Sequence, residues 1–173
     1  MKKLFLCGLI CTLSLAPGVT YAKERAQKVI HKCTKKDNSV NALACNVYME
    51  ARGETINGQM AVAFVTMNRM KHDKFPTTMK GVVYQASQFS WTLTKSSYNI
   101  TDKDSWEGAL SISKFVHKLK NNEILYKRFD PTYGSLYYHT KKVKPVWRKL
   151  LKRTVTIENH IFYKDKEEEK KKK

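Results

Sequence analysis

Hydrophobic residues recur at helical spacing in three stretches of the chain. Residues 40–52 carry an apolar stripe, residues 59–70 are apolar nearly all round, and a third amphipathic stretch runs from residues 102–104 to about 119. A helix that is apolar on every side normally lies at the centre of a domain. The pattern therefore predicts three helices, with residues 59–70 as the buried one.

Later in the chain the pattern changes to strands. A turn cluster at residues 130–134 precedes a predicted strand at Ser135–Thr140. Residues 153–157 and 160–164 alternate apolar with polar side chains and meet at Glu158-Asn159, which is typical of a hairpin. The predicted fold class is thus α+β and mainly helical, with a small β-hairpin region.

The two ends differ in composition from this body. Residues 1–22 begin with two lysines, continue with an apolar run at 4–16 and end in small residues before Ala22, as a cleavable export signal does. An uncleaved N-terminal anchor is the alternative. We expect a loosely held basic arm at residues 23–38, one folded domain at residues 39–164 and a disordered charged tail at residues 165–173.

Two of the four cysteines lie inside this leader, which leaves Cys33 and Cys45 in the exported chain. An even pair in an exported protein indicates a disulfide, which would tie the N-terminal segment to the helix at 40–52. Closing a loop of this size stabilises a fold by about 3 kcal/mol. The alternative is two free thiols, with Cys45 packed as a small hydrophobic residue.

The formal net charge is +18. The leader contains two lysines and no acids, so the exported chain carries +16. So large a positive field favours polyanions. For an exported protein these include anionic peptidoglycan, surface polymers and lipid head groups. No nucleic-acid-binding motif is present, and a charge of this size binds DNA without specificity, so we expect no specific nucleic-acid partner.

Glu50 is the first candidate for chemistry. On a helical projection it lies at the border of the apolar stripe, next to Leu43, and is therefore expected to be half-buried. Desolvation raises the pKa of a carboxyl group, and a neutral carboxylic acid can protonate a leaving oxygen. The alternative is an ordinary surface glutamate. Glu54, one turn further on, is a secondary carboxylate candidate or a simple loop and capping acid.

Aromatic and polar residues are interleaved at Phe89-Ser90-Trp91 and Tyr137-Tyr138-His139. Such faces stack on sugar rings while their polar tips bond hydroxyl groups. Ordinary core packing is the alternative for each ring. His117, His139 and His160 have no metal-ligand spacing, so we expect no metal, and no cofactor motif is present.

Four ordered motifs resemble the cell-wall hydrolase family that includes the spore cortex-lytic enzymes. The first is ALACNVYMEARGETINGQMAVAFVTMNRM at residues 42–70, and the others lie at residues 81–92, 130–139 and 159–163. The resemblance covers about residues 40–164. The chain departs from many relatives at Thr132-Tyr133-Gly134, where they have Thr-Gly-Gly, and no stretch resembles a separate wall-binding domain.

The resemblance implies a lysozyme-like helical body and makes residues 39–164 a catalytic domain that cleaves the glycan strand of peptidoglycan. The family's essential acid, the glutamate of its E-A-R-G-E-type motif, maps to Glu50, the first of the two glutamates. No cofactor is implied, and a monomer is expected. The residues expected to bind substrate are Gln88, Phe89, Ser90, Trp91, Tyr137, Tyr138, His139 and His160.

The expected reaction is cleavage of the β-1,4 bond between N-acetylmuramic acid and N-acetylglucosamine, with Glu50 as the general acid. Because no second carboxylate is obviously placed as a nucleophile, lytic transglycosylation is preferred, with the muramoyl 6-hydroxyl closing a 1,6-anhydro ring. The alternatives are a simple hydrolytic muramidase or glucosaminidase, and a peptidoglycan-binding protein without turnover.

Overall fold

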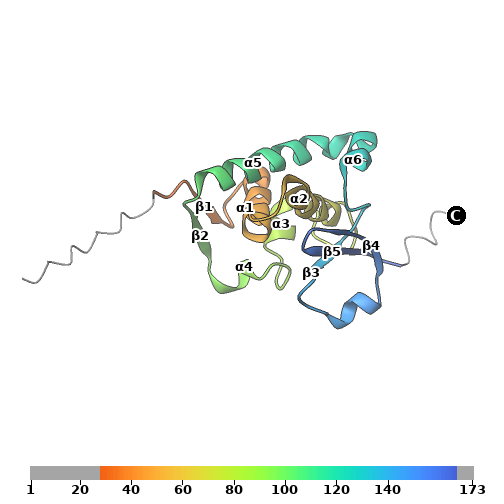
Figure 1. Ribbon diagram of the computed structural model, residues 1–173. Coiled ribbons are helices and arrows are strands. Elements are labelled where there is room, and N and C mark those ends of the chain that lie inside the picture. Colours follow the sequence, from red (N-terminus) through yellow and green to blue (C-terminus); the bar gives the residue numbers. More distant parts are fainter. Residues whose placement is uncertain (1–27, 167–173) are drawn as a thin grey trace, which may run out of the picture.

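The computed structural model describes residues 28–166, so the predicted leader and most of the predicted tail lie outside the described residues. Three helices form the body: α1 (Ser39–Ala51), α2 (Ile56–Met70) and α5 (Lys103–Lys118) (Figure 1). All three predicted helices are confirmed. α2 begins three residues earlier than its apolar run, because Ile56, Asn57 and Gly58 supply its first turn.

α2 is the buried centre of the domain, as its composition predicts. Its residues from Ala61 to Arg69 are all buried, and it packs against α1, α5 and the short helix α3 (Met79–Val83). Phe64 and Met67 of α2 meet Leu43 of α1 in the main hydrophobic core. Burying such side chains contributes about 1.5–3 kcal/mol each.

Side-chain caps fix where two of the helices begin. The Asn38 side chain accepts a hydrogen bond from the Asn41 amide at 2.8 Å at the start of α1. Asp102 accepts from the Ser105 amide at 3.1 Å at the start of α5, as its position predicts. Each cap of this kind stabilises a helix by about 1 kcal/mol.

Further short helices complete the body and were not predicted. They are α4 (Trp91–Thr94), η1 (Leu119–Asn121) and α6 (Glu123–Phe129). Within residues 28–166, no helix has both the length and the apolar character needed to span a bilayer.

The larger sheet is antiparallel, with the order β3 (Tyr137–Thr140), β5 (His160–Lys164), β4 (Lys152–Ile157). The predicted β4–β5 hairpin is confirmed, and β3 pairs with β5 so that Tyr138 lies opposite Phe162. The connection between β3 and β4 contains a 3-10 helix, η2 (Val146–Lys149). This sheet packs against α2 and brings β3 to the end of α1.

The smaller sheet corrects the expectation of a loose arm at residues 23–38. β1 (His31–Thr34) pairs with β2 (Ser97–Ile100) on the side of the body opposite the larger sheet (Figure 1). Cys33 is buried there in a disulfide with Cys45. A covalent link and a paired strand hold residues that composition alone describes only as basic and polar.

The expected start of the disordered tail at residue 165 is also wrong. Asp165 is buried, and its carboxylate lies 2.7 Å from the Lys74 ammonium. A charge run at a chain end is normally solvated, but here one acid within the run has a basic partner on the body.

Candidate active site

Glu50 lies in the last turn of α1 and is half-buried, as the stripe geometry predicts. The Tyr138 hydroxyl, from β3, donates a hydrogen bond to Glu50 Oε2 at 3.1 Å. Burial raises the pKa of Glu50 above its ordinary value, and this effect outweighs the opposing effects of the Tyr138 hydrogen bond and of the Arg69 charge. The site therefore favours a protonated carboxylic acid.

Arg69 is a buried cation close to this acid. It lies near the end of α2, is only 5% exposed, and donates from Nε to the Leu136 carbonyl at 2.7 Å. Its guanidinium carbon lies 5.2 Å from the centre of the Phe89 ring and 5.4 Å from that of Phe75. Burial lowers the pKa of Arg69. Sequence reasoning missed this residue, although an arginine inside an otherwise apolar helix is itself a signal.

A cleft of about 450 Å³ opens beside Arg69 and Tyr138. Glu50 is not among the lining residues, but the Tyr138 side chain that reaches it forms part of the cleft wall. The wall is aromatic and aliphatic with a few polar groups, which is the composition of a ligand site. The lining residues are Arg69, Ser87, Gln88, Tyr137, Tyr138, Trp147, Leu150 and Leu151.

Three of the expected substrate-binding residues, Gln88, Tyr137 and Tyr138, line this cleft. Phe89 and Trp91 do not line it, and their positions agree with the alternative of core packing. Both are buried in the main core, and Trp91 donates from Nε1 to Asn46 Oδ1 at 3.0 Å. Their ring faces are occupied by protein neighbours, so they support the site from behind.

Ser90 and His139 are also separated from the cleft. Ser90 is exposed and is not among the residues that line it. His139 is buried, stacks on Tyr163 and shares a 3.0 Å hydrogen bond between Nε2 and the Tyr163 hydroxyl.

His160 lies next to Tyr138, with the two ring centres 5.2 Å apart in an edge-on arrangement. Burial lowers the pKa of His160, although the nearby Glu54 and Glu158 carboxylates act in the opposite direction. A neutral imidazole packed against Tyr138 fixes the ring whose hydroxyl reaches Glu50. His160 is thus placed behind the acid's hydrogen-bond donor.

Glu54 is held by the hairpin rather than by Glu50. Its Oε1 accepts a hydrogen bond from the Asn159 side chain at 3.1 Å. Its Cβ also approaches Gly58 so closely that a Cβ added there would lie 2.7 Å away, which only glycine permits. The neighbouring Glu158 carboxylate accepts from the Thr55 amide at 3.3 Å. The polar turn at residues 54–58 therefore clamps the β4–β5 turn against the body.

The turn at residues 130–134 sets the path of β3. One oxygen of the Asp130 carboxylate accepts from the Thr132 amide at 2.8 Å, and the other accepts from the Gly134 amide at 2.9 Å. Asn68 of α2 donates to the same carboxylate at 3.0 Å. Tyr133 adopts a left-handed φ of 57° with an exposed ring. This buried network ties the strand that carries Tyr138 to α2.

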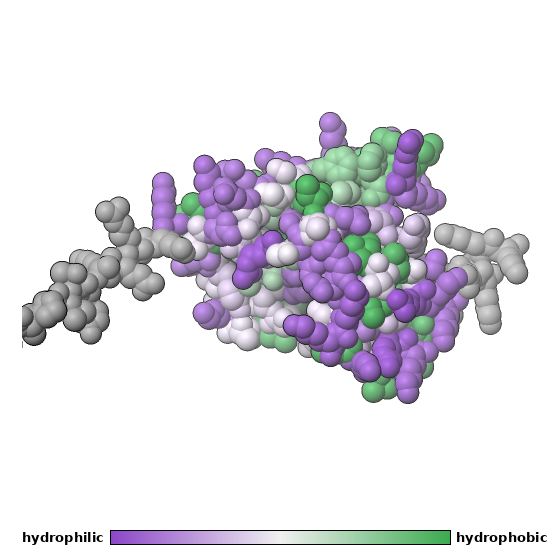
Figure 2. Space-filling model, viewed as in Figure 1, coloured by the Kyte–Doolittle hydropathy of each residue, from purple (hydrophilic) through white to green (hydrophobic). Residues whose placement is uncertain are grey.

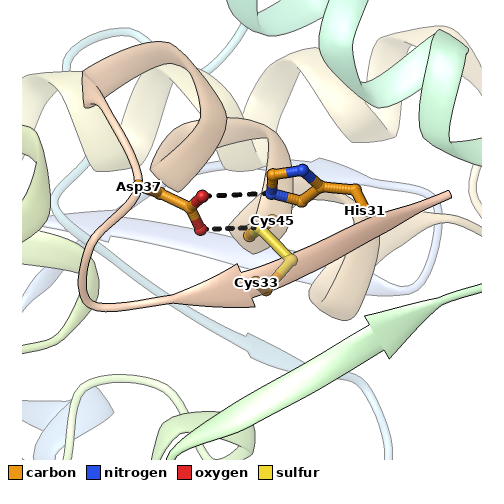
Figure 3. Close-up of side chains that lie close together, drawn as sticks. All are labelled: His31, Cys33, Asp37 and Cys45. Carbon is orange, nitrogen blue, oxygen red and sulfur yellow. Dashed lines mark hydrogen bonds and ion pairs between the residues drawn. A yellow bond between two sulfur atoms is a disulfide. The ribbon is translucent and has the colours of Figure 1, made fainter. Parts of the chain in front are cut away.

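A second group of potential ligands lies on the far side of the body. His31, Cys33, Asp37 and Cys45 bring one ligand atom each to within 4.8 Å of one another (Figure 3). The two sulfur atoms are bonded to each other, however, and metals bind the thiolate. His31 Nε2 lies 3.1 Å from Asp37 Oδ1, and its ring stacks on Trp106. The arrangement is that of a disulfide packed beside a histidine–aspartate pair.

Known proteins are similar to this chain in sequence and in architecture. The catalytic domain of the Bacillus cereus SleB protein is 28% identical, with a TM-score of 0.56 over 73% of this chain and 89% of that one. The catalytic domain of the germination-specific lytic transglycosylase SleB from Bacillus anthracis is 27% identical, with a TM-score of 0.54 over 74% of this chain and 95% of that one.

Curated spore cortex-lytic enzymes are also similar. That of Bacillus cereus is 30% identical over 73% of this chain and 44% of its own length. That of Halalkalibacterium halodurans is 31% identical over 73% of this chain and 34% of its own length. The chain thus spans less than half of the curated relatives that it matches.

The family comparison rests on the segment that builds the cleft. The Cell Wall Hydrolase family model matches residues 53–163, which include Glu54, Arg69 and every cleft-lining residue, and begin just after Glu50. This match covers well over half of the chain, and the fold agrees with that of two solved catalytic domains. The chain therefore belongs to the cell wall hydrolase family.

Proposed function

We propose that this protein cleaves the glycan strand of peptidoglycan between N-acetylmuramic acid and N-acetylglucosamine, with Glu50 as the general acid. The observation that carries the proposal is the half-buried Glu50 carboxyl, whose pKa is raised by burial and whose position is fixed by Tyr138 at the wall of the cleft. A neutral carboxylic acid there can give its proton to a glycosidic oxygen.

Glu50 is preferred to Glu54 on the geometry of their partners. Glu50 is reached by Tyr138, which also lines the cleft, whereas Glu54 is engaged by Asn159 of the hairpin turn. The family match includes Glu54 and begins after Glu50, so the choice rests on these contacts. Glu54 acts in this scheme as a positioning residue for the β4–β5 turn.

The fate of the sugar cation follows from what surrounds the cleft. No aspartate or glutamate is among the described residues that line the cleft, and Glu54, the other carboxylate of the motif, is engaged by Asn159 of the hairpin turn, which supports a reaction without a protein nucleophile. In retaining glycosidases such a group lies about 5–5.5 Å from the acid. We therefore favour lytic transglycosylation, in which the muramoyl 6-hydroxyl attacks the anomeric carbon. Glu50, now a carboxylate, takes that hydroxyl proton as a 1,6-anhydro ring closes.

Arg69 supports this cycle electrostatically. Its charge favours the carboxylate form of Glu50, which exists only after the proton has been given. Burial and the Arg69 charge thus act in opposite directions on the same group. A carboxyl balanced in this way can serve first as acid and then as base.

The cell envelope is the compartment where this substrate occurs. The predicted export signal and the similarity to spore cortex-lytic enzymes both support a site of action outside the cytoplasm. We also propose that the positive charge of the exported chain, +16 without the predicted leader, provides affinity for anionic envelope polymers. A monomer is sufficient for the proposed chemistry, because one chain supplies the acid and the cleft.

Digestion of purified peptidoglycan tests the proposal, with products identified by mass spectrometry. Glu50→Gln is expected to lower the cleavage rate by about 10²–10⁴-fold. Glu54→Gln is the matched control, because it makes the same chemical change one turn away, and it is expected to retain most of the activity. Full activity in a folded Glu50→Gln protein would refute the assignment. Anhydro-muramic ends would support transglycosylation, whereas reducing ends would mean hydrolysis.

A further inference from the structure

The connection between β3 and β4, taken together with the first two residues of β4 as residues 141–153, is the most basic surface segment that the structure describes beside the cleft. We call it the basic loop. Its sequence, KKVKPVWRKLLKR, contains seven lysine or arginine residues and no acid. In Figure 1 it extends from the lower edge of the larger sheet, away from the helices. Such a segment concentrates positive charge at one end of the molecule.

The same loop exposes apolar side chains between its charges. Val146 is 81% exposed and Val143 is 51% exposed, while Trp147 and Leu150 also reach the surface. Figure 2 shows apolar surface at this lower edge, surrounded by hydrophilic side chains. Grouped exposed apolar residues with a charged rim mark a site of interaction with a partner or a membrane.

The loop holds these side chains in a defined conformation. η2 orders its centre, where the Leu150 amide donates to the Trp147 carbonyl at 3.0 Å. The inner edge of Trp147 packs against His139 and Tyr163, with ring centres 5.5 and 5.6 Å apart. Binding through such a surface loses little conformational freedom, because the tip is already ordered.

A second exposed apolar patch, on α6, differs in its charge. Ile124 is 80% exposed there, with Phe129 nearby on the same helix. Glu123 lies beside it and forms ion pairs with Lys127 at 3.0 Å and Lys71 at 3.7 Å. The α6 patch therefore has a mixed, internally compensated rim, whereas the basic loop has only positive charge.

We propose that the basic loop docks on an anionic phospholipid bilayer, with Val143 and Val146 entering the head-group region and the surrounding lysines facing lipid phosphates. A wall polymer rich in phosphate would satisfy the charges but would leave these aliphatic side chains in water. A bilayer interface satisfies both, and it also suits the amphipathic ring of Trp147.

Docking in this way would place the cleft at the membrane surface. Trp147, Leu150 and Leu151 belong to the basic loop and also line the cleft. The bilayer would then lie against one cleft wall, and glycan strands near the membrane would be the accessible ones. Lipid binding itself is independent of the proposed glycosidase reaction, since it needs neither Glu50 nor a sugar.

The test is binding to phosphatidylglycerol–phosphatidylcholine vesicles, measured by co-sedimentation with the chain lacking residues 1–22, since the predicted leader is apolar enough to enter lipid itself. Val143→Ser/Val146→Ser removes apolar surface without changing charge and is expected to weaken binding about tenfold. Leu93→Ser/Ile124→Ser is the matched control, because these side chains, 62% and 80% exposed, lie on other helices. The control is expected to bind like the parent chain.

A charge variant, Lys144→Glu/Lys149→Glu, is expected to weaken binding to the same vesicles by more than about tenfold. Equal binding to vesicles of phosphatidylcholine alone would overturn the proposal. If the charge variant lost binding while Val143→Ser/Val146→Ser bound like the parent chain, the proposal would also be overturned. That result would indicate that the loop adsorbs to an anionic surface by charge alone. None of these binding measurements depends on peptidoglycan cleavage, so their outcome is independent of whether the proposed function is correct.

Discussion

The two small sheets lie on opposite sides of the same helical body and serve it differently (Figure 1). The β1–β2 sheet is joined to α1 by the disulfide between Cys33 and Cys45. Asp37, which follows β1, has its carboxylate paired with His31. The larger sheet contains no disulfide among its described strands, and its Tyr138 faces Glu50 beside an open cleft. One sheet ties the N-terminal strand to α1, and the other holds the hydrogen-bond donor of the proposed acid.

Both sheets act on α1. Cys45, near the middle of this helix, is bonded to Cys33 of β1, while Glu50, in its last turn, is reached from β3. A helix fixed at one point by a covalent bond can present a side chain at another with little freedom. The comparison therefore predicts that damage to the first sheet affects stability, whereas damage to the second affects the rate.

Removing the disulfide is expected to have the largest effect on stability. Cys33→Ser/Cys45→Ser opens a loop with a sequence separation of 12 residues and should lower the free energy of unfolding by about 3 kcal/mol. Urea unfolding monitored by tryptophan fluorescence measures this loss. Peptidoglycan cleavage per folded molecule should stay close to that of the parent chain. A proportional fall in that specific rate would show that the two sheets are not separable.

Tyr138→Phe tests the other sheet. The ring is kept, but the hydroxyl that donates to Glu50 is lost, so the cleavage rate is expected to fall about tenfold, in line with a hydrogen bond to a charged group. Since that hydrogen bond lowers the pKa of Glu50, its loss should raise the pKa further. Activity that requires protonated Glu50 should then persist to higher pH, which a pH–rate profile measures.

Tyr126→Phe is the matched control for this profile. Its buried hydroxyl donates to Asn68 Oδ1 at 2.7 Å, in the network around Asp130. Its removal should reduce stability and leave the pH dependence unchanged. A shift of equal size in both variants would mean that Tyr138 acts through packing and not through the acid.

The local pattern of apolar and polar residues was sufficient to predict much of the fold. The stripe in α1 placed Glu50 at the edge of the core, and the all-apolar composition of α2 placed that helix at the centre. The alternation in β4 and β5 located the hairpin. These features depend on neighbours within a few turns, which a sequence displays directly.

Long-range contacts were harder to predict. Phe89 and Trp91 are aromatic in a polar stretch and were expected to face sugars, yet they fill the core behind Arg69 and Asn46. β1 pairs with a strand more than 60 residues away, so its short basic sequence contains no local trace of a sheet. Arg69 acquires its environment partly from Leu136 and Phe89, which are both distant in sequence.

The smallest expected effect is on stability: the buried Glu50 carboxyl is expected to destabilise the fold, separately from its proposed role as the general acid. A carboxyl whose pKa is raised in the folded state binds its proton more tightly there than in the unfolded chain, so folding becomes less favourable as pH rises above the unfolded value of 4.5. Glu50→Gln removes this titration. The variant should therefore have the higher melting temperature at pH 7, and the difference should shrink as the pH falls toward 4.

Calorimetry of the parent chain and Glu50→Gln across that range measures the effect. A parent chain that is more stable than the variant at pH 7 would mean that Tyr138 and Arg69 overcompensate the burial of the carboxylate. In that case Glu50 would be ionised in the free protein, and the proton for the leaving group would have to be taken up when substrate displaces water from the cleft. The sign of this stability difference thus shows whether the folded protein raises or lowers the pKa of Glu50.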